Sequence, residues 1–128
     1  AKSVLEFLSN HEAVAWVRHP DLPDHPNHAV AQRQLPKGTT SMIVFGVKGG
    51  FDAGRKLINS VKLASHVSNV GDAKTLLVHP ASTTHMQLGP EQRKLAGVPD
   101  DLIRLSVGIE HVDDIIDDLR ASLRASQR

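Results

Sequence analysis

The sequence lacks cysteine and tyrosine altogether, and only 3% of its 128 residues are aromatic. The absence of cysteine excludes disulfides, thiolate catalysis and cysteine-based zinc or iron–sulfur sites, and it fits a reducing compartment. The shortage of aromatic side chains argues against a stacking platform for single-stranded nucleic acid. A formal net charge of +1 gives no electrostatic footprint for nucleic acid or an anionic membrane. No apolar run approaches the roughly 18 residues that a membrane span needs.

The composition is that of an ordinary globular domain, with 40% hydrophobic and 23% charged residues. A chain of this length is the usual size of one domain, so we expect a single domain over residues 1–128. The first apolar stripe, formed by Val4, Leu5 and Leu8, has almost no lead-in or cap before it. Such a start is typical of a segment cut from a longer chain, and we expect this chain to be one.

Hydrophobic periodicity predicts strands that alternate with helices along the chain. Short alternating or β-branched runs favour strands, whereas apolar residues three and four apart favour amphipathic helices. The predicted strands are 14–18, 42–48, 75–78 and 102–108. The predicted helices are 2–11, 29–34, 51–63, 90–96 and 111–125. This order predicts an α+β fold in which about four strands are covered by helices.

The segment HPDLPDHPNH contains five side chains of the types that bind metal ions, namely His19, Asp21, Asp24, His25 and His28. No known zinc signature matches their spacing. Loops rich in proline and aspartate are commonly solvated turns. We therefore predict no metal at this loop, and a metal-binding protein is the weakest of the functions considered.

Two other motifs carry little chemistry. The pair Gly49-Gly50 lacks the spacing of a P-loop or a dinucleotide fingerprint, and a tight strand–helix turn explains it. The segment DAKTLLVHPASTTH holds His79, Ser82 and His85, which are groups used in nucleophilic catalysis. No nucleophile elbow accompanies them. We predict that His79 ends a strand and makes local hydrogen bonds.

Arg104 is the most informative single position. In the predicted strand LIRLSVGIE it shares one face with Leu102 and Ser106 and is flanked by apolar residues. An arginine in such surroundings needs an anionic partner. The partner is either a carboxylate of the protein or a carboxylate of a ligand, which the planar guanidinium binds through two parallel hydrogen bonds. The residues alone leave these two interpretations equally open.

Three ordered motifs, NVGDAKTL, HPASTTH and IRLSVGIEHVDDIIDDL, resemble the C-terminal domain of the pyridoxal-phosphate (PLP)-dependent enzymes of Cys/Met metabolism. The resemblance runs from VAWVRHP to the last helix. That family includes the cystathionine synthases and lyases, methionine γ-lyase and O-acetylhomoserine sulfhydrylase. The segment from Asn69 to Asp72, where the lyases usually have Ser-Leu-Gly, the motif FGVKGG and the pair Thr83-Thr84 most resemble the O-acetylhomoserine sulfhydrylase branch.

The resemblance implies the small C-terminal domain of a fold-type I PLP enzyme, with about four mainly antiparallel strands. The large PLP-binding domain is expected to be absent from this chain. In the family, the lysine that binds the cofactor lies in that large domain in a Ser-x-Thr-Lys context, which none of the lysines here has. By resemblance, Arg104 holds the substrate α-carboxylate, Asn69 lies near that carboxylate, and Thr84 supports the same wall.

The implied reaction replaces the acetate of O-acetylhomoserine with sulfide or methanethiol and yields homocysteine or methionine. The resemblance also implies a cytoplasmic homotetramer. Since the cofactor-binding lysine and phosphate cup are missing, we expect the isolated chain to be inactive and not to bind PLP. The alternative is a stand-alone module that has kept the fold and binds a carboxylate ligand or a partner. No nucleic acid, metal ion or membrane is an expected partner.

Overall fold

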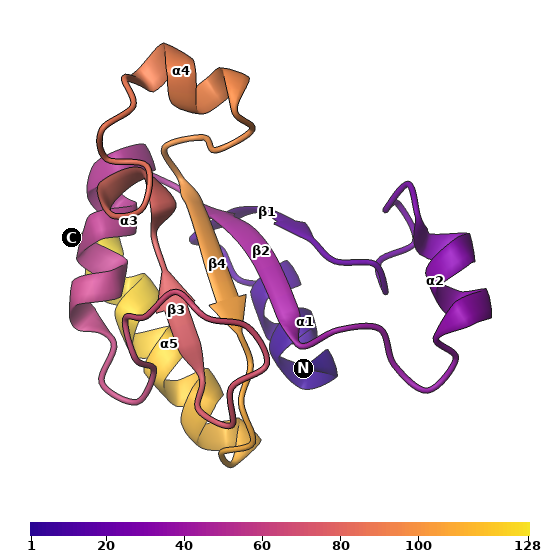
Figure 1. Ribbon diagram of the computed structural model, residues 1–128. Helices are drawn as coiled ribbons and strands as arrows, with labels where there is room; N and C mark the ends of the chain where they lie inside the picture. Colours follow the sequence, from indigo (N-terminus) through magenta and orange to yellow (C-terminus); the bar gives the residue numbers. More distant parts are fainter.

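Four short segments form one antiparallel sheet in the computed structural model, which describes all 128 residues (Figure 1). They are β1 (Val14–Arg18), β2 (Met42–Val47), β3 (Leu76–Val78) and β4 (Leu102–Ser106). The spatial order is β1-β2-β4-β3, and every neighbouring pair is antiparallel. The last strand of the chain therefore lies inside the sheet, and it carries Arg104 there.

Helices follow and precede these strands in the order predicted from the sequence. They are α1 (Lys2–Ser9), α2 (His28–Gln34), α3 (Gly50–Ser60), α4 (Pro90–Leu95) and α5 (Val112–Ser126), with a 3-10 turn η1 (Pro80–Ser82) after β3. Figure 1 shows α3 and α5 beside the sheet, whereas α2 and α4 extend away from it. No residue of α2 is buried. No helix has both the length and the apolar character that crossing a membrane requires.

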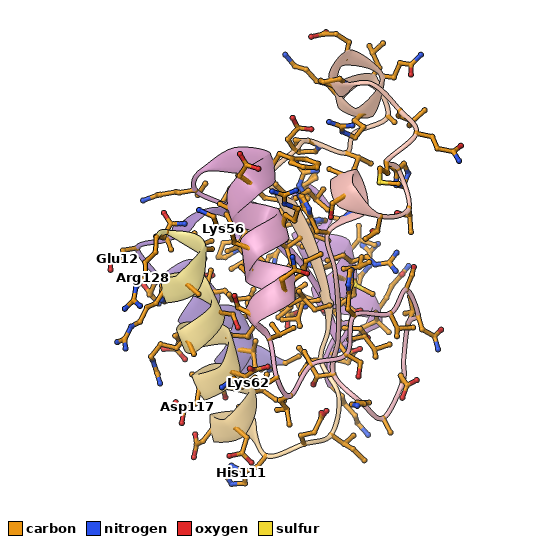
Figure 2. The ribbon with its side chains drawn as sticks, turned by 90° about the vertical axis from the view of Figure 1, so that its left-hand side faces the viewer. Glu12, Lys56, Lys62, His111, Asp117 and Arg128 are labelled. Carbon is orange, nitrogen blue, oxygen red and sulfur yellow. The ribbon has the colours of Figure 1, made fainter.

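The period-two alternation of the strands decides which face of the sheet is the core. Ile43 and Phe45 of β2 and Ile103 and Leu105 of β4 have no exposed surface. They belong to one apolar cluster together with buried residues of α1, α3 and α5. The outer side of these helices carries charged residues such as Lys56 (Figure 2). The three amphipathic helices thus cover one face of the sheet.

The predicted fold class, an α+β fold with four antiparallel strands, is confirmed. Most predicted boundaries agree with the structure to within three residues. The helices cover one face only, and on the other face Met42, Val44, Leu102 and Arg104 are all partly exposed. That uncovered face holds the candidate site.

Candidate carboxylate-binding site

The strand register fixes which side chains lie on the uncovered face of the sheet. Trp16 pairs with Gly46, and Gly46 pairs with Leu102; Arg18 pairs with Val44, and Val44 pairs with Arg104. Residues that pair directly in neighbouring strands point to the same side. We call the resulting surface the open face; its members from β1, β2 and β4 are Trp16, Arg18, Met42, Val44, Gly46, Leu102, Arg104 and Ser106.

Arg104 lies in the interior of the open face, between Val44 of β2 and Val78 of β3. Its Nη2 donates a hydrogen bond to Ser68 Oγ at 2.8 Å. None of the ion pairs in the protein includes Arg104. Of the two partners that the sequence leaves open, a carboxylate of this chain is therefore excluded by the structure. The guanidinium group remains available to a carboxylate from outside the chain.

The loop between α3 and β3 brings Ser68 next to Arg104. The loop begins at a fixed point, because the carboxylate of Asp118 on α5 accepts the backbone N–H groups of residues 62–64 at 2.8, 2.9 and 3.1 Å. Hydrogen bonds from three consecutive amides to one charged group hold a segment more firmly than neutral hydrogen bonds do. The start of the loop is therefore attached to the helical layer.

The end of the same loop is attached to β4 and to the segment that follows it. Thr75 donates from its backbone N–H and from Oγ1 to the two carboxylate oxygens of Glu110, at 2.7 and 2.8 Å. Burial opposes ionisation of Glu110, but the hydrogen bonds from Thr75 and from the backbone N–H of Glu110, together with the charge of Lys74, outweigh it. The pKa of Glu110 therefore lies below its ordinary value. Within the loop, Gly71 N–H donates to Ser106 Oγ at 3.4 Å. These contacts hold Ser68 at the position where it meets Arg104.

Asn69 and Thr84 are placed differently with respect to Arg104. Asn69 follows Ser68, is exposed, and accepts a hydrogen bond from Val70 N–H through its own Oδ1 at 2.9 Å. Its amide N–H groups have no partner within the chain and remain available to a ligand. Thr84 is also exposed, but its Oγ1 pairs with Nδ1 of His85 at 2.9 Å, and no hydrogen bond joins it to Arg104 or Asn69. Asn69 is thus next in the chain to Ser68, the partner of Arg104, and no hydrogen bond joins Asn69 or Thr84 to Arg104.

His79 is fully buried at the end of β3. Its Nε2 donates to the Asp100 carbonyl at 2.7 Å, and its Nδ1 pairs with Ser82 Oγ at 2.9 Å. Burial lowers the pKa of His79, so the ring is neutral, with its proton on Nε2 because the carbonyl can only accept. The predicted local hydrogen bonds of His79 are present, and they fix η1 against the turn that leads into β4. His79 and Ser82 therefore shape the chain.

The histidines of the loop between β1 and β2 also serve local structure. Nδ1 of His19 accepts the N–H of Asp21 at 3.1 Å, and Nδ1 of His25 accepts the N–H of Asn27 at 3.2 Å. His28 pairs with a backbone carbonyl at 2.8 Å. Nowhere in the chain do three His, Asp or Glu side chains come together in a way that could hold a metal ion. The metal-binding interpretation thus gains no support from the geometry.

Ser68, Asp118 and Glu110 are the parts of the site that the sequence does not predict. Ser68 directly precedes Asn69, and this adjacency is the signal that could have identified it. Asp118 and Glu110 act on the loop from 54 to 56 and from 35 residues away in the sequence. Their roles depend on tertiary contacts that no local pattern reveals.

Comparison with known proteins places this arrangement in a sequence family. Residues 1–124 match the family described as Cys/Met metabolism PLP-dependent enzymes. Homocysteine synthase of Schizosaccharomyces pombe is 48% identical over 126 residues, which are 98% of this chain and 29% of that protein. O-acetyl-L-homoserine sulfhydrylase 1 of Thermus thermophilus is 47% identical over 117 residues, 91% of this chain and 28% of that protein.

Similar proteins also include a lyase and a solved synthase. L-methionine gamma-lyase of Fusobacterium nucleatum subsp. polymorphum is 48% identical over 123 residues, 96% of this chain and 31% of that protein. Cystathionine gamma synthase from Xanthomonas oryzae pv. oryzae, solved in complex with aminoacrylate and cysteine, has a TM-score of 0.88 and 38% identity, over 99% of this chain and 33% of that one. The chain thus spans less than a third of the length of these three curated relatives.

Proposed function

Because this chain belongs to the Cys/Met metabolism PLP-dependent enzymes, we propose that it is the C-terminal, substrate-side part of an O-acetylhomoserine sulfhydrylase. In this proposal the large PLP-binding domain lies outside the 128 residues. The full-length enzyme makes homocysteine or methionine from O-acetylhomoserine and sulfide or methanethiol, as a cytoplasmic homotetramer. The isolated chain has no transferase activity.

The observation that carries the proposal is the free guanidinium group of Arg104. It has no carboxylate partner within the chain, and Ser68 holds it on the partly exposed side of the sheet. A guanidinium group binds a carboxylate through two parallel hydrogen bonds, which fixes both the position and the plane of the bound group. In our proposal Arg104 binds the substrate α-carboxylate in this way, and the free amide of Asn69 donates to the same group.

Anchoring one end of an amino acid has a consequence for its reactive atoms. Once the α-carboxylate is fixed on a strand in the interior of the sheet, the α-amino group and the Cα–H bond lie at defined distances from the anchor. Holding reacting groups in place removes much of the entropic barrier to their reaction. Arg104 would thus serve orientation, and Thr84 would support the wall of the site from its loop.

This chain alone does not fit the cofactor. All seven lysines are exposed, so none offers an enclosed amine, and every buried polar side-chain atom already has a partner within the chain. When bound, PLP withdraws electrons from the substrate Cα. In our proposal residues outside this chain hold it, and the contribution of these 128 residues is limited to binding and orienting the substrate.

Sulfhydrylases and a lyase are similar to this chain at nearly the same identity, so the identities do not separate the two reactions. The sulfhydrylase assignment is supported by Asn69, which stands where the lyases usually have serine, and by the Thr83-Thr84 pair. Full-length enzyme given O-acetylhomoserine and sulfide should form homocysteine faster than it releases thiol from methionine. Faster thiol release from methionine, without sulfide, would refute the assignment. Repeating the assay with methanethiol in place of sulfide and comparing the two rates identifies the native sulfur donor.

Titration of the isolated chain with PLP tests where the cofactor is held. We expect no saturable visible absorption band of an imine, because no lysine is enclosed. A saturable band that disappears when one lysine is changed to alanine would contradict the proposal. The alternative function, a stand-alone carboxylate-binding module, rests on the same free Arg104 and requires only that the chain bind carboxylates without PLP.

A further inference from the structure

The outer side of α5 carries a line of residues whose charge changes sign halfway along the helix. Five residues follow one another there at intervals of three and four positions, namely Asp114, Asp117, Ala121, Arg124 and Arg128. Residues at these intervals lie along one side of a helix, and we call this line the outer row. All five are exposed. Figure 2 shows Asp117 and Arg128 on the outer side, toward opposite ends of α5.

Most charges of the outer row have no partner within the chain. None of the ion pairs includes Asp114, Arg124 or Arg128. Asp117 pairs with Arg120, but 71% of the Asp117 side chain stays exposed. An exposed pair of this kind contributes at most about 1 kcal/mol. The outer row therefore presents two negative and two positive charges to a molecule from outside the chain.

The helix dipole accounts for only part of this arrangement. It favours acidic residues in the first turn and basic residues in the last, and its effect falls off within those turns. Asp114 lies in the first turn of α5 and Arg124 in the last, whereas Asp117 lies beyond the first turn. The dipole also gives no reason for an alanine, Ala121, at the centre of the row. A partner surface of complementary charge explains both features.

The outer row is complementary to itself when its direction is reversed. If two α5 helices lie antiparallel with Ala121 facing Ala121, Arg128 of one copy comes opposite Asp114 of the other, since both are seven residues from Ala121. Arg124 comes opposite Asp117 in the same way, to within one position. A twofold axis through Ala121 forms each contact twice. The small side chain of Ala121 also allows the two helices to approach closely.

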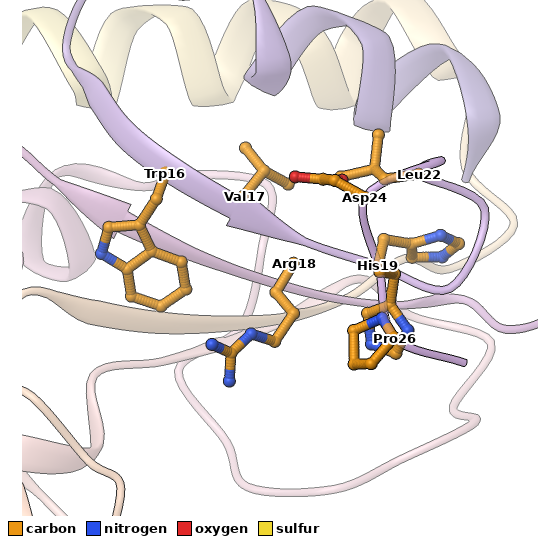
Figure 3. Close-up of a pocket in the computed structure, with 8 residues that line it drawn as sticks. Trp16, Val17, Arg18, His19, Leu22, Asp24 and Pro26 are labelled. Carbon is orange, nitrogen blue, oxygen red and sulfur yellow. The ribbon is translucent and has the colours of Figure 1, made fainter. Parts of the chain in front are cut away.

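A copy on the outer row leaves the open face uncovered. Figure 3, a close-up of the pocket beside β1, shows Trp16 and Arg18 on one side of the strand and Val17 on the other. Val17 packs against the apolar core, which α5 helps to form, so Trp16 and Arg18 point away from the helices. The outer row and the open face therefore lie on opposite sides of the molecule. An inference about the outer row does not depend on the proposed function.

We propose that the outer row is a contact surface for a second copy of this chain, in which two α5 helices pair antiparallel about a twofold axis at Ala121. The contact joins exposed charges, which contribute about 0.2–1 kcal/mol for each pair. A helix of 15 residues buries less surface than a stable dimer needs. The contact is therefore weak and reversible, and salt weakens it further.

Cysteine cross-linking in the full-length enzyme tests the geometry of the pairing. These 128 residues contain no cysteine, so Ala121→Cys places a single thiol at the proposed axis, with any cysteine elsewhere in the enzyme changed to serine. A disulfide requires Cβ atoms about 4 Å apart. Oxidation with diamide should therefore yield a covalent dimer of subunits on a denaturing gel, and less of it at high salt. Ala29→Cys, at an exposed alanine of α2, is the matched control.

Charge reversal distinguishes this pairing from random collision of the introduced thiols. Combined with Ala121→Cys, either Arg124→Asp with Arg128→Asp or Asp114→Arg with Asp117→Arg gives the row a single sign. Each combination should lower the yield of covalent dimer at least about tenfold, because four attractive pairs become repulsive. Co-expression of the two combinations should restore the dimer, since an acidic row then meets a basic one. Activity should be unchanged in both.

Three results would overturn the inference. Ala121→Cys forms no more covalent dimer than Ala29→Cys, or the charge-reversed combinations cross-link as well as Ala121→Cys alone, or co-expression fails to restore the dimer. The last result would mean that the outer row binds a different partner. None of these results bears on the proposed function, which fails separately if full-length enzyme does not convert O-acetylhomoserine and sulfide.

Discussion

On one face of the sheet Phe45 and Leu105 are fully buried beneath helices, whereas their chain neighbours Val44 and Arg104 are partly exposed on the other face. Each strand supplies both faces, since successive side chains point to opposite sides. The covered face gains free energy by burying apolar surface. The open face instead carries Arg18 and Arg104, and none of the ion pairs of the chain includes either of them. The difference predicts that substitutions on the covered face change stability and that substitutions on the open face change ligand binding.

Phe45→Ala compared with Val44→Ala should show the largest contrast. Loss of the fully buried Phe45 leaves a cavity in the core and should cost about 3–5 kcal/mol of unfolding free energy. Val44 is partly exposed on the open face, and its truncation should cost less than about 1 kcal/mol. Urea denaturation of both variants measures the two values. Equal losses would mean that the two faces are equally important to the fold.

Asp118→Ala should have the next largest effect, because Asp118 connects the covered side to the loop over the open face. Its carboxylate accepts three backbone N–H groups, and its loss should cost about 1–3 kcal/mol. Amide exchange should become faster at residues 62–64. Asp117→Ala is the matched control, since exposed Asp117 pairs only with Arg120 and should change stability by less than about 1 kcal/mol. Similar effects of both variants would contradict the anchoring role.

Acidification should destabilise the protein moderately through His79. Burial lowers the pKa of His79 in the folded chain below the ordinary 6.5, so the unfolded chain binds more protons just below that pH. The stabilisation is complete above pH 6.5 and is lost as pH falls toward the folded pKa. His11, whose pKa burial also lowers, adds to the same window. NMR titration of the imidazole signals, paired with urea unfolding at each pH, measures both quantities. A His79 pKa at or above 6.5 would contradict this account.

Ser68→Ala should have the smallest effect on stability. Ser68 is exposed and contributes one hydrogen bond to Arg104, so stability should change by less than about 0.5 kcal/mol. Carboxylate affinity should nevertheless fall about two- to fivefold, because Arg104 would lose the contact that orients it. Ser3→Ala, an exposed serine of α1, should change neither quantity. Unchanged carboxylate binding in Ser68→Ala would show that Ser68 does not position Arg104.

Most of the fold follows from local pattern. The β-branched run that forms β2 and the apolar spacing of α5 specify their own elements. The antiparallel arrangement of the strands was implied by the family resemblance and not by the order of the elements, because alternating strands and helices are also typical of parallel sheets. That helices cover only one face could not be predicted, because helix placement depends on long-range packing. The predicted third strand begins at Thr75, but in the structure Thr75 binds Glu110 and β3 begins at Leu76.

The candidate site was predictable only in part. The sequence identifies Arg104 as an arginine that needs an anion and leaves the source of that anion open. Only the three-dimensional arrangement shows that no carboxylate of the chain reaches it and that Ser68 does. That Arg18 lies on the same face of the sheet as Arg104 likewise follows only from the strand register, since 86 positions separate them in the sequence. The roles of Asn69 and Thr84 at a bound substrate stay predictions.

The most direct test of the central claim is the kinetics of Arg104→Lys in the full-length enzyme. Lysine keeps the charge but loses the planar pair of donors, so kcat/KM for O-acetylhomoserine should fall by about tenfold or more. Arg33→Lys, on exposed α2, should leave kcat/KM unchanged, and unfolding of both variants should match that of the unchanged enzyme. A kcat/KM for Arg104→Lys equal to that of the unchanged enzyme would show that Arg104 does not anchor the substrate carboxylate.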